Sequence, residues 1–180
     1  NACYNNIPQK GYAYWFFDPL VTACSDEGWS SEEVQGTSIQ SMYNANESAS
    51  SHPIRDMHDG HGAANNAYWS RYWQQIRLCN QFLENIGTAA VNSEAERARF
   101  TAEAHVMRAF FYSELVKWFG KVPIVDKTIA FDADFSTLKR EAVYDVARFI
   151  AEDCDAGLNC AELPWRITTE DEAMRATKAL

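Results

Sequence analysis

The residues best suited to hold a ligand lie near the start of the chain. Asp26, Glu27 and Trp29 fall in a stretch rich in serine and glycine, and Tyr43 follows in the same polar segment. A tryptophan on a loop offers a flat apolar face to a sugar ring, and a nearby carboxylate accepts hydrogen bonds from sugar hydroxyls. We predict that these four residues contact a ligand. The alternative is that Trp29 anchors its loop on the first helix of the chain.

A second polar group contains three histidines, in the sequence SHPIRDMHDGHG that begins at Ser51. His58 and His61, with Asp56 or Asp59, could supply ligands to zinc or another metal. No cysteine lies near them, and glycine-rich loops often carry histidines that bind nothing, so contact with a partner protein is the alternative. We predict no metal and no cofactor for the chain, and the role of His58 and His61 stays open.

Motifs for catalysis are missing from the sequence. It has no GxSxG elbow, no HExxH, no Walker loop and no GxGxxG before a helix. Between residues 141 and 172 nine acidic residues stand against two arginines, without the spacing of a calcium loop. Such a run is typical of a solvated helix face. We therefore predict a non-enzymatic protein with no catalytic residue.

Composition excludes several classes of protein. Of the 180 residues 47% are apolar, which excludes intrinsic disorder, and no stretch approaches the roughly 18 apolar residues of a membrane span. The net charge of −9 argues against nucleic acid as a partner, because binding a phosphate backbone needs a basic face. The content of 10 Phe, 8 Tyr and 6 Trp is high and would suit a ligand with flat faces, such as a sugar.

The cysteines match no zinc or CxxC pattern, and their odd number leaves at least one unpaired: Cys3, Cys24, Cys79, Cys154 and Cys160. Cys79 falls among apolar residues of a predicted helix, where a buried free thiol is expected. Cys154 and Cys160 could form a disulfide, but the sequence does not decide the pairing.

The elements that position these residues are helices. Apolar residues at three- and four-residue steps predict a helix over 66–87, and Ser93 with Glu96 forms a capping box that opens a long helix closed by Gly120. A further helix is predicted over 140–155, ending near Gly157, with Val143, Val146, Ile150 and Cys154 facing inward. Long helices joined by short turns pack as antiparallel pairs. The chain is therefore predicted to be all-α, or nearly so.

Two charged residues lie in the middle of the long predicted helix. Glu103 and Arg108 could be taken for an acid and its catalytic partner, but in an apolar helix a paired acid and base satisfy each other's buried charge. We interpret both as residues that hold the fold, together with Trp69, Tyr72 and Asn80. Asn80 is expected to tie backbone groups between helices.

Four ordered motifs between Trp69 and Pro164 resemble the SusD/RagB family. They are WSRYWQQIRLCNQFL from Trp69, AEAHVMRAFFY from Ala102, FGKVPIV from Phe119, and Arg140 to Asp153 followed by Leu163-Pro164. Ahead of Trp69 the resemblance is looser and rests on Ser25-Asp26-Glu27 and the loop that follows.

The resemblance implies a function at the cell surface. Members of the SusD/RagB family are outer-membrane lipoproteins of Bacteroidetes that bind glycans or peptides and cap a TonB-dependent transporter of the SusC type. Their N-terminal half is built of tetratricopeptide-like antiparallel helix pairs, and loops together with the C-terminal portion form the ligand face. The expected function is thus binding of an oligosaccharide or peptide nutrient for delivery to such a transporter. The alternative is a helical-repeat scaffold that binds a protein partner.

The chain departs from the family pattern at two places. Cys3 has no lipobox before it, so we expect the lipid anchor that would place the protein on the outer membrane to lie outside this chain. Met174 stands where the family usually has glycine before Arg175-Ala176-Thr177-Lys178. We expect an N-terminal portion of a longer protein. It would comprise a helix with ligand-side loops over 1–66, a helix-pair core over 67–165 and the start of the next helix over 166–180.

Overall fold

The computed structural model describes residues 2–4, 26, 45, 48, 68–172 and 175–179. Within them the chain is helical and has no strand, so the predicted all-α class is confirmed. The three long helices are α4 (Tyr68–Asn85), α5 (Glu94–Phe119) and α6 (Val143–Asn159). The chain divides into two compact units, one of residues 6–71 and one of residues 1–5 with 72–180. All interactions described below belong to the second unit.

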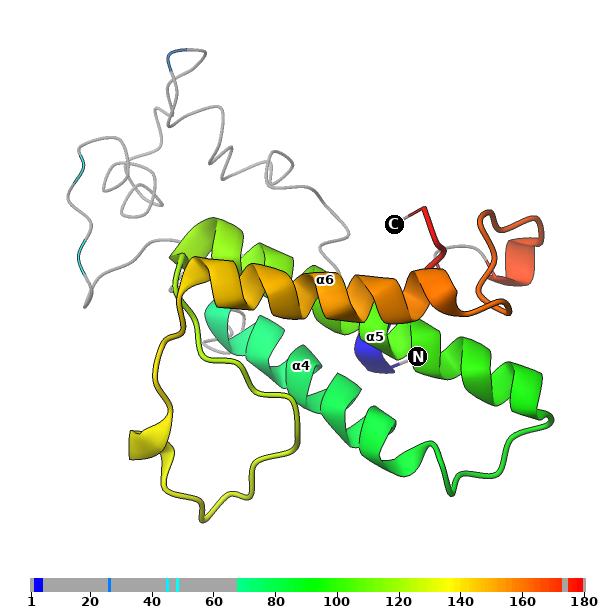
Figure 1. Ribbon diagram of the computed structural model, residues 1–180, viewed down its shortest axis with the longest axis horizontal. Coiled ribbons are helices and arrows are strands. Elements are labelled where there is room, and N and C mark those ends of the chain that lie inside the picture. The colour runs from blue at the N-terminus through cyan, green and yellow to red at the C-terminus, as the bar shows by residue number, and fades with distance from the viewer. Residues whose placement is uncertain are drawn as a thin grey trace, which may run out of the picture. The chain divides into compact units, whose positions relative to one another are not determined.

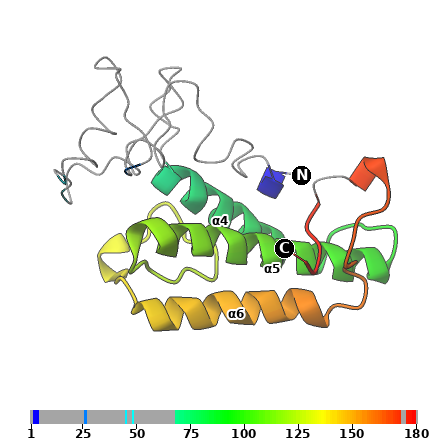
Figure 2. The ribbon, with the colours of Figure 1, turned by 90° about the horizontal axis from the view of Figure 1, so that it is seen from above.

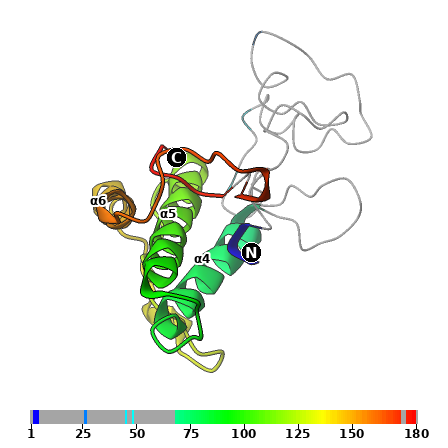
Figure 3. The ribbon, with the colours of Figure 1, turned by 90° about the vertical axis from the view of Figure 1, so that its right-hand side faces the viewer.

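Helix α5 is the central element of this unit. It lies between α4 and α6 in Figures 2 and 3, and it runs in the opposite direction to both of them, as Figure 1 shows. The predicted antiparallel pairing is therefore present. A tetratricopeptide-like repeat stays a prediction. Three short 3-10 helices complete the described elements: η1 (Ala2–Tyr4), η2 (Phe135–Thr137) and η3 (Glu170–Glu172).

Both ends of α5 have the predicted caps. The Ser93 hydroxyl accepts a hydrogen bond from the Glu96 amide at 3.1 Å. The Glu96 carboxylate reaches back one residue further than a capping box requires and accepts from the Asn92 amide at 2.9 Å. At the other end Gly120 adopts φ +65°, and its amide donates to the Val116 carbonyl at 2.9 Å.

A line of aromatic contacts joins the three helices. The rings of Tyr72 on α4 and Phe111 on α5 are 5.9 Å apart, and Trp73 meets Tyr112 edge-on at the same distance. Tyr112 in turn meets Phe149 on α6 edge-on at 5.1 Å. Part of the high aromatic content is thus used for packing and not for recognition.

The predicted inward face of α6 is correct only in part. Val146 is fully buried, and Ile150 and Cys154 are half-buried. Val143 was predicted to face inward, but it is 43% exposed. The reason is that α6 begins at Val143, three residues later than predicted, so this side chain lies on the first turn at the edge of the packed surface.

Helix α6 ends two residues beyond Gly157, close to where the sequence predicts its end. The helix continues to Asn159, and Gly157 is buried within its last turn. A Cβ atom at Gly157 would clash with Cγ2 of Val106 on α5. The glycine is therefore needed for the close approach of two helices and not for termination.

Helix α5 is also the longest described helix, with 26 residues. That length would suffice for a membrane span, but the charged residues Glu103 and Arg108 lie near its middle. Among the described residues, no helix is both long and apolar enough to cross a bilayer.

The segment 166–180 was predicted to begin a further helix. In its described part it holds η3 and an irregular stretch over 175–179. This stretch is tied to the rest of the unit, because Ala176 is buried and the Lys178 amide donates to the Pro164 carbonyl at 3.0 Å.

Candidate functional site

The predicted ligand contacts fall mostly outside the described residues. Glu27, Trp29 and Tyr43 lie outside them, as do His58 and His61. Asp26 is described, and its side chain is exposed at a turn. In the described part of the chain, no three His, Cys, Asp or Glu side chains come together as a metal site.

A buried ionic pair joins Arg108 on α5 to Asp153 on α6. Two parallel hydrogen bonds of 2.7 Å run from Nε and Nη2 of Arg108 to the two carboxylate oxygens of Asp153. Both residues are buried, with 6% and 3% of their surface exposed. Such a bidentate pair is stable in the interior because each charge satisfies the other.

Further hydrogen bonds extend this pair to α4 and to the loop after α5. Nη1 of Arg108 donates to Oδ1 of Asn80 at 2.8 Å, and the Asn80 amide donates to the Val125 carbonyl at 2.9 Å. Nδ1 of His105 lies 2.6 Å from Asp153. Burial opposes ionisation of Asp153, but the hydrogen bonds from Arg108 and His105 outweigh it and lower its pKa. We call these residues the Arg108 cluster.

A surface hollow of about 460 Å³ lies beside the Arg108 cluster, between α4, α5 and α6. His105, with its side chain 26% exposed, lines it and is oriented by Asp153, an arrangement that also occurs in general bases. The other lining residues include no Ser, Thr or Cys that could act as a nucleophile: Leu83, Glu84, Arg108, Asp126, Phe149, Glu152 and Asp153. The same Asp153 carboxylate is held by Arg108, so the His105–Asp153 contact is part of the Arg108 cluster.

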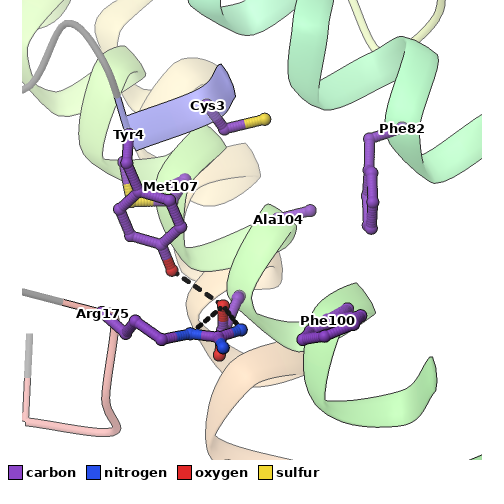
Figure 4. A pocket seen from close by; sticks show the side chains of 8 residues that line it. Cys3, Tyr4, Phe82, Phe100, Ala104, Met107 and Arg175 are labelled. Carbon is purple, nitrogen blue, oxygen red and sulfur yellow. Dashed lines mark hydrogen bonds and ion pairs between the residues drawn. The ribbon is translucent and has the colours of Figure 1, made fainter. Parts of the chain in front are cut away.

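A smaller cavity of about 180 Å³ lies on the other side of α5 and is shown in Figure 4. Its wall is mainly apolar, and its charged lining residues are Glu103 and Arg175, which form an ion pair. The remaining lining residues come from η1, α4 and α5: Cys3, Tyr4, Phe82, Phe100, Ala104 and Met107.

The Glu103 carboxylate is fully used in holding the chain together. One oxygen accepts hydrogen bonds from the Tyr4 hydroxyl at 2.9 Å and from Nη2 of Arg175 at 2.7 Å, and the other accepts from Nε of Arg99 at 3.1 Å. The Tyr4 hydroxyl also accepts from the Ala176 amide at 3.1 Å. With both oxygens occupied, Glu103 is not suited to act as a base. We call these residues the Glu103 cluster.

Glu103 and Arg108 are therefore structural, as predicted, but their predicted pairing with each other is wrong. Five positions apart on α5, they belong to two separate clusters. The other residues predicted to hold the fold behave as expected: Tyr72 and Asn80 are fully buried, and Trp69 is half-buried. Asn80 does link a backbone carbonyl to another helix.

The sequence analysis did not predict that Asp153 is the partner of Arg108. It was counted with the solvated acidic face, yet it is one of the buried residues of α6. A signal was present, since Asp153 follows Val146 by seven residues and precedes Gly157 by four, which places all three on one helical face.

Cys79 is a buried free thiol, as expected. Cys154 and Cys160, for which a disulfide was left open, are both free. Cys3 is also free and half-buried.

The fold places the chain among helical proteins whose long helices pack in antiparallel fashion. A sequence family described as "Starch-binding associating with outer membrane", the SusD-like family, matches residues 17–178. The chain belongs to the SusD-like family. No curated protein matches the chain.

Solved structures similar to this chain include other SusD-like proteins. One from Bacteroides fragilis is 32% identical with a TM-score of 0.56, over 70% of this chain and 24% of that one. A laminarin-binding SusD-like protein is 24% identical with a TM-score of 0.65, over 82% of this chain and 28% of that one. A SusD-like carbohydrate-binding protein from Bacteroides fragilis is 21% identical with a TM-score of 0.66, over 98% of this chain and 33% of that one. The last two likenesses show the fold, and this chain spans a third or less of each of the three.

Proposed function

We propose that this chain is part of a non-enzymatic cell-surface protein that binds an oligosaccharide or peptide nutrient and delivers it to a SusC-like TonB-dependent transporter. The observation that carries the proposal is the family match over residues 17–178, because that family is described as starch-binding and associated with the outer membrane. The names of similar structures, one of which binds laminarin, support a glycan as the ligand. The protein would be a surface-exposed outer-membrane lipoprotein, held by a lipid anchor.

The ligand contacts that we propose are Asp26, Glu27, Trp29 and Tyr43. Their chemistry supports this assignment, because an aromatic face and carboxylates are what a sugar ring with its hydroxyls requires. The exposure of the Asp26 side chain agrees with such a contact. Neither cluster on α5 offers a competing site, since the carboxylates of Glu103 and Asp153 are already hydrogen-bonded within the protein.

An exposed apolar surface supports a protein partner such as the transporter. It follows the loop between α5 and α6 into the first turn of α6, and exposure rises to 91% at Phe131 and 76% at Tyr144. The surface consists of Phe131, Phe135, Leu138, Val143 and Tyr144. Exposed aromatic and aliphatic side chains in this number are more typical of a protein contact than of a solvated loop.

The ligand assignment is tested by Trp29→Ala in titration calorimetry against laminarin, starch oligosaccharides and a peptide library. We expect the affinity for the bound class to fall about tenfold or more, because the apolar face for the ligand is lost. The matched control is Trp165→Ala, which removes another tryptophan, 66% exposed, from the helical unit. Equal affinity of Trp29→Ala and the unmodified protein would contradict the assignment.

The same titrations separate the alternatives. Absence of binding to every glycan and peptide, together with co-purification of an unrelated protein, would favour the helical-repeat scaffold. Turnover of any glycan would contradict a non-enzymatic role. For the transporter, we expect co-purification with a SusC-like protein to be lost in the Phe131→Asp, Tyr144→Asp double variant and retained in Trp165→Asp.

A further inference from the structure

The cavity beside the Glu103 cluster has the size of a small aromatic molecule. Its volume is about 180 Å³, and apolar cavities of roughly 150 Å³ in proteins bind benzene. The lining residues named above come from η1, α4, α5 and the segment 175–179, and all of them belong to the compact unit of residues 1–5 and 72–180. The walls of the cavity are therefore held together by one part of the molecule.

The lining residues differ in their burial. Ala104 and Met107 of α5 are the most buried, with 4% and 1% of their surface exposed. Tyr4, Phe82 and Phe100 are half-buried, so a ligand can enter between them. In Figure 4, Tyr4 and Phe82 lie on opposite sides of Ala104. The space exists because the side chain of Ala104 is only a methyl group.

The charged and hydroxyl groups that line the cavity are paired with one another. Nη2 of Arg175 donates a hydrogen bond to the Glu103 carboxylate at 2.7 Å, and the Tyr4 hydroxyl donates to the same oxygen at 2.9 Å. The guanidinium of Arg175 also lies 5.0 Å from the ring centroid of Phe100. A polar ligand such as a sugar would have to replace these contacts in order to form its own. An apolar ligand leaves them intact.

The apolar lining favours an aromatic ligand over an aliphatic one. Phe82 and Phe100 can meet a further ring edge-on, which is a preferred arrangement of aromatic rings. Met107 contributes a thioether sulfur, which makes favourable contacts with aromatic rings, and the Cys3 thiol behaves as a small apolar group. Size and lining therefore agree on the same class of ligand.

We propose that this cavity binds a small apolar molecule with a single aromatic ring, of the size of toluene. The ring fills the space beside Ala104, contacts the two phenylalanines and leaves the ion pair between Glu103 and Arg175 unchanged. The affinity comes from the apolar surface that both partners remove from water. Because the ligand is bound only by the folded protein, it also stabilises the fold. The site differs in chemistry from the proposed sugar contacts, so its test does not depend on them.

The test is a titration of the complete chain with toluene, followed by thermal unfolding and by the amide chemical shifts in NMR spectra. We expect a saturable rise of the Tm by about 2–4 °C, with shifted amide signals from the lining residues and their neighbours. Methylcyclohexane, which has a similar size but no aromatic ring, should bind about fivefold more weakly. The proposal would be overturned by a lack of saturable binding, by shifts confined to other parts of the chain, or by equal affinity for the two molecules.

The matched variants are Ala104→Leu and Ala95→Leu. The longer side chain at position 104 fills the cavity, so toluene should no longer raise the Tm. Ala95 is exposed on the first turn of α5, and its substitution should leave toluene binding unchanged. Toluene binding by Ala104→Leu with the affinity of the unmodified chain would contradict the assignment to this cavity. Should Ala104→Leu fail to fold, the amide shifts of the unmodified chain decide the matter without it.

Discussion

Helix α5 carries two buried charged residues, Arg108 and Glu103, which have different structural roles. Arg108 binds Asp153 on α6 and Asn80 on α4, so its cluster joins the three long helices to one another. Glu103 binds Tyr4 and Arg175, so its cluster holds two segments that are far apart in sequence against the same helix. One charge stabilises the bundle, and the other attaches the flanking segments to it.

The two clusters also differ in how far they are removed from water. The side chains of Arg108 and Asp153 are 7% and 5% exposed. In the other cluster Glu103 is 5% exposed, but its partners Arg99 and Arg175 are 20% and 29% exposed. An arginine left without its carboxylate is therefore already partly hydrated in the Glu103 cluster, whereas Asp153 without Arg108 is 5% exposed and keeps only His105 as an ionic partner. The comparison predicts a larger and more global loss of stability when the Arg108 cluster is broken.

The largest effect is expected for Arg108→Ala. Because the substitution leaves the buried Asp153 carboxylate with only its contact to His105, the free energy of unfolding should fall by about 3–5 kcal/mol. Urea denaturation followed by circular dichroism measures this change. Arg148→Ala is the matched control, since that arginine lies on α6 with its side chain 63% exposed. Normal melting of Arg108→Ala combined with loss of ligand binding would show that Arg108 belongs to a binding site.

A smaller and more local effect is expected for Glu103→Ala. We expect the free energy of unfolding to fall by roughly 2–3 kcal/mol, because the two arginines that lose their carboxylate can turn toward water. Amide hydrogen exchange should show lost protection at Ala176 and retained protection in α6. The exposed Glu152 provides the control variant Glu152→Ala. Equal loss of protection in α6 would mean that the two clusters are not separate.

The smallest expected effect is on the stability of the protein at acid pH. The pKa of Asp153 is lowered in the folded protein from an ordinary value of 3.8, so its ionisation stabilises the folded state above that value. This contribution is lost as the pH falls below about 4 and through the folded pKa. Thermal melts between about pH 5 and pH 2 should show a steeper acid loss for the unmodified protein than for Asp153→Asn. Asp155→Asn, which alters an exposed residue of α6, should keep the steep profile.

The local features of the fold were predictable from the sequence, while contacts between distant residues were not. Ser93 and Gly120 mark the ends of α5 because capping depends on residues within one turn. Tyr4 and Arg175 lie 99 and 72 residues from Glu103, and Asp153 lies 45 residues from Arg108, so no spacing rule places these partners. The role of Gly157 was also not predictable. A glycine that ends a helix and a glycine that allows another helix to pack closely cannot be distinguished from the sequence.

The prediction of the ligand site was based on the chemistry of the residues more than on the fold. Asp26, Glu27, Trp29 and Tyr43 were chosen because loops with aromatic and carboxylate groups suit sugars, and that choice stays a prediction. The aromatic excess that first favoured a sugar ligand is explained in part by packing, as in the contacts of Tyr72 and Tyr112. Composition alone therefore overstated the number of aromatic residues free to bind a ligand.

The hydrogen bond between Tyr4 and Ala176 has a consequence for the order of folding. It joins residues 172 positions apart, whereas the Arg108–Asp153 pair closes over only 45. Because closing a longer loop costs more chain entropy, the bundle of α5 and α6 should form first and the contacts of Tyr4 last. During synthesis Glu103 would lack its ion pair with Arg175 until that residue leaves the ribosome, with Arg99 as its helical neighbour and Tyr4 already synthesised. A nascent chain halted before that point would expose the apolar wall of the cavity, and it is this intermediate that a chaperone would have to protect.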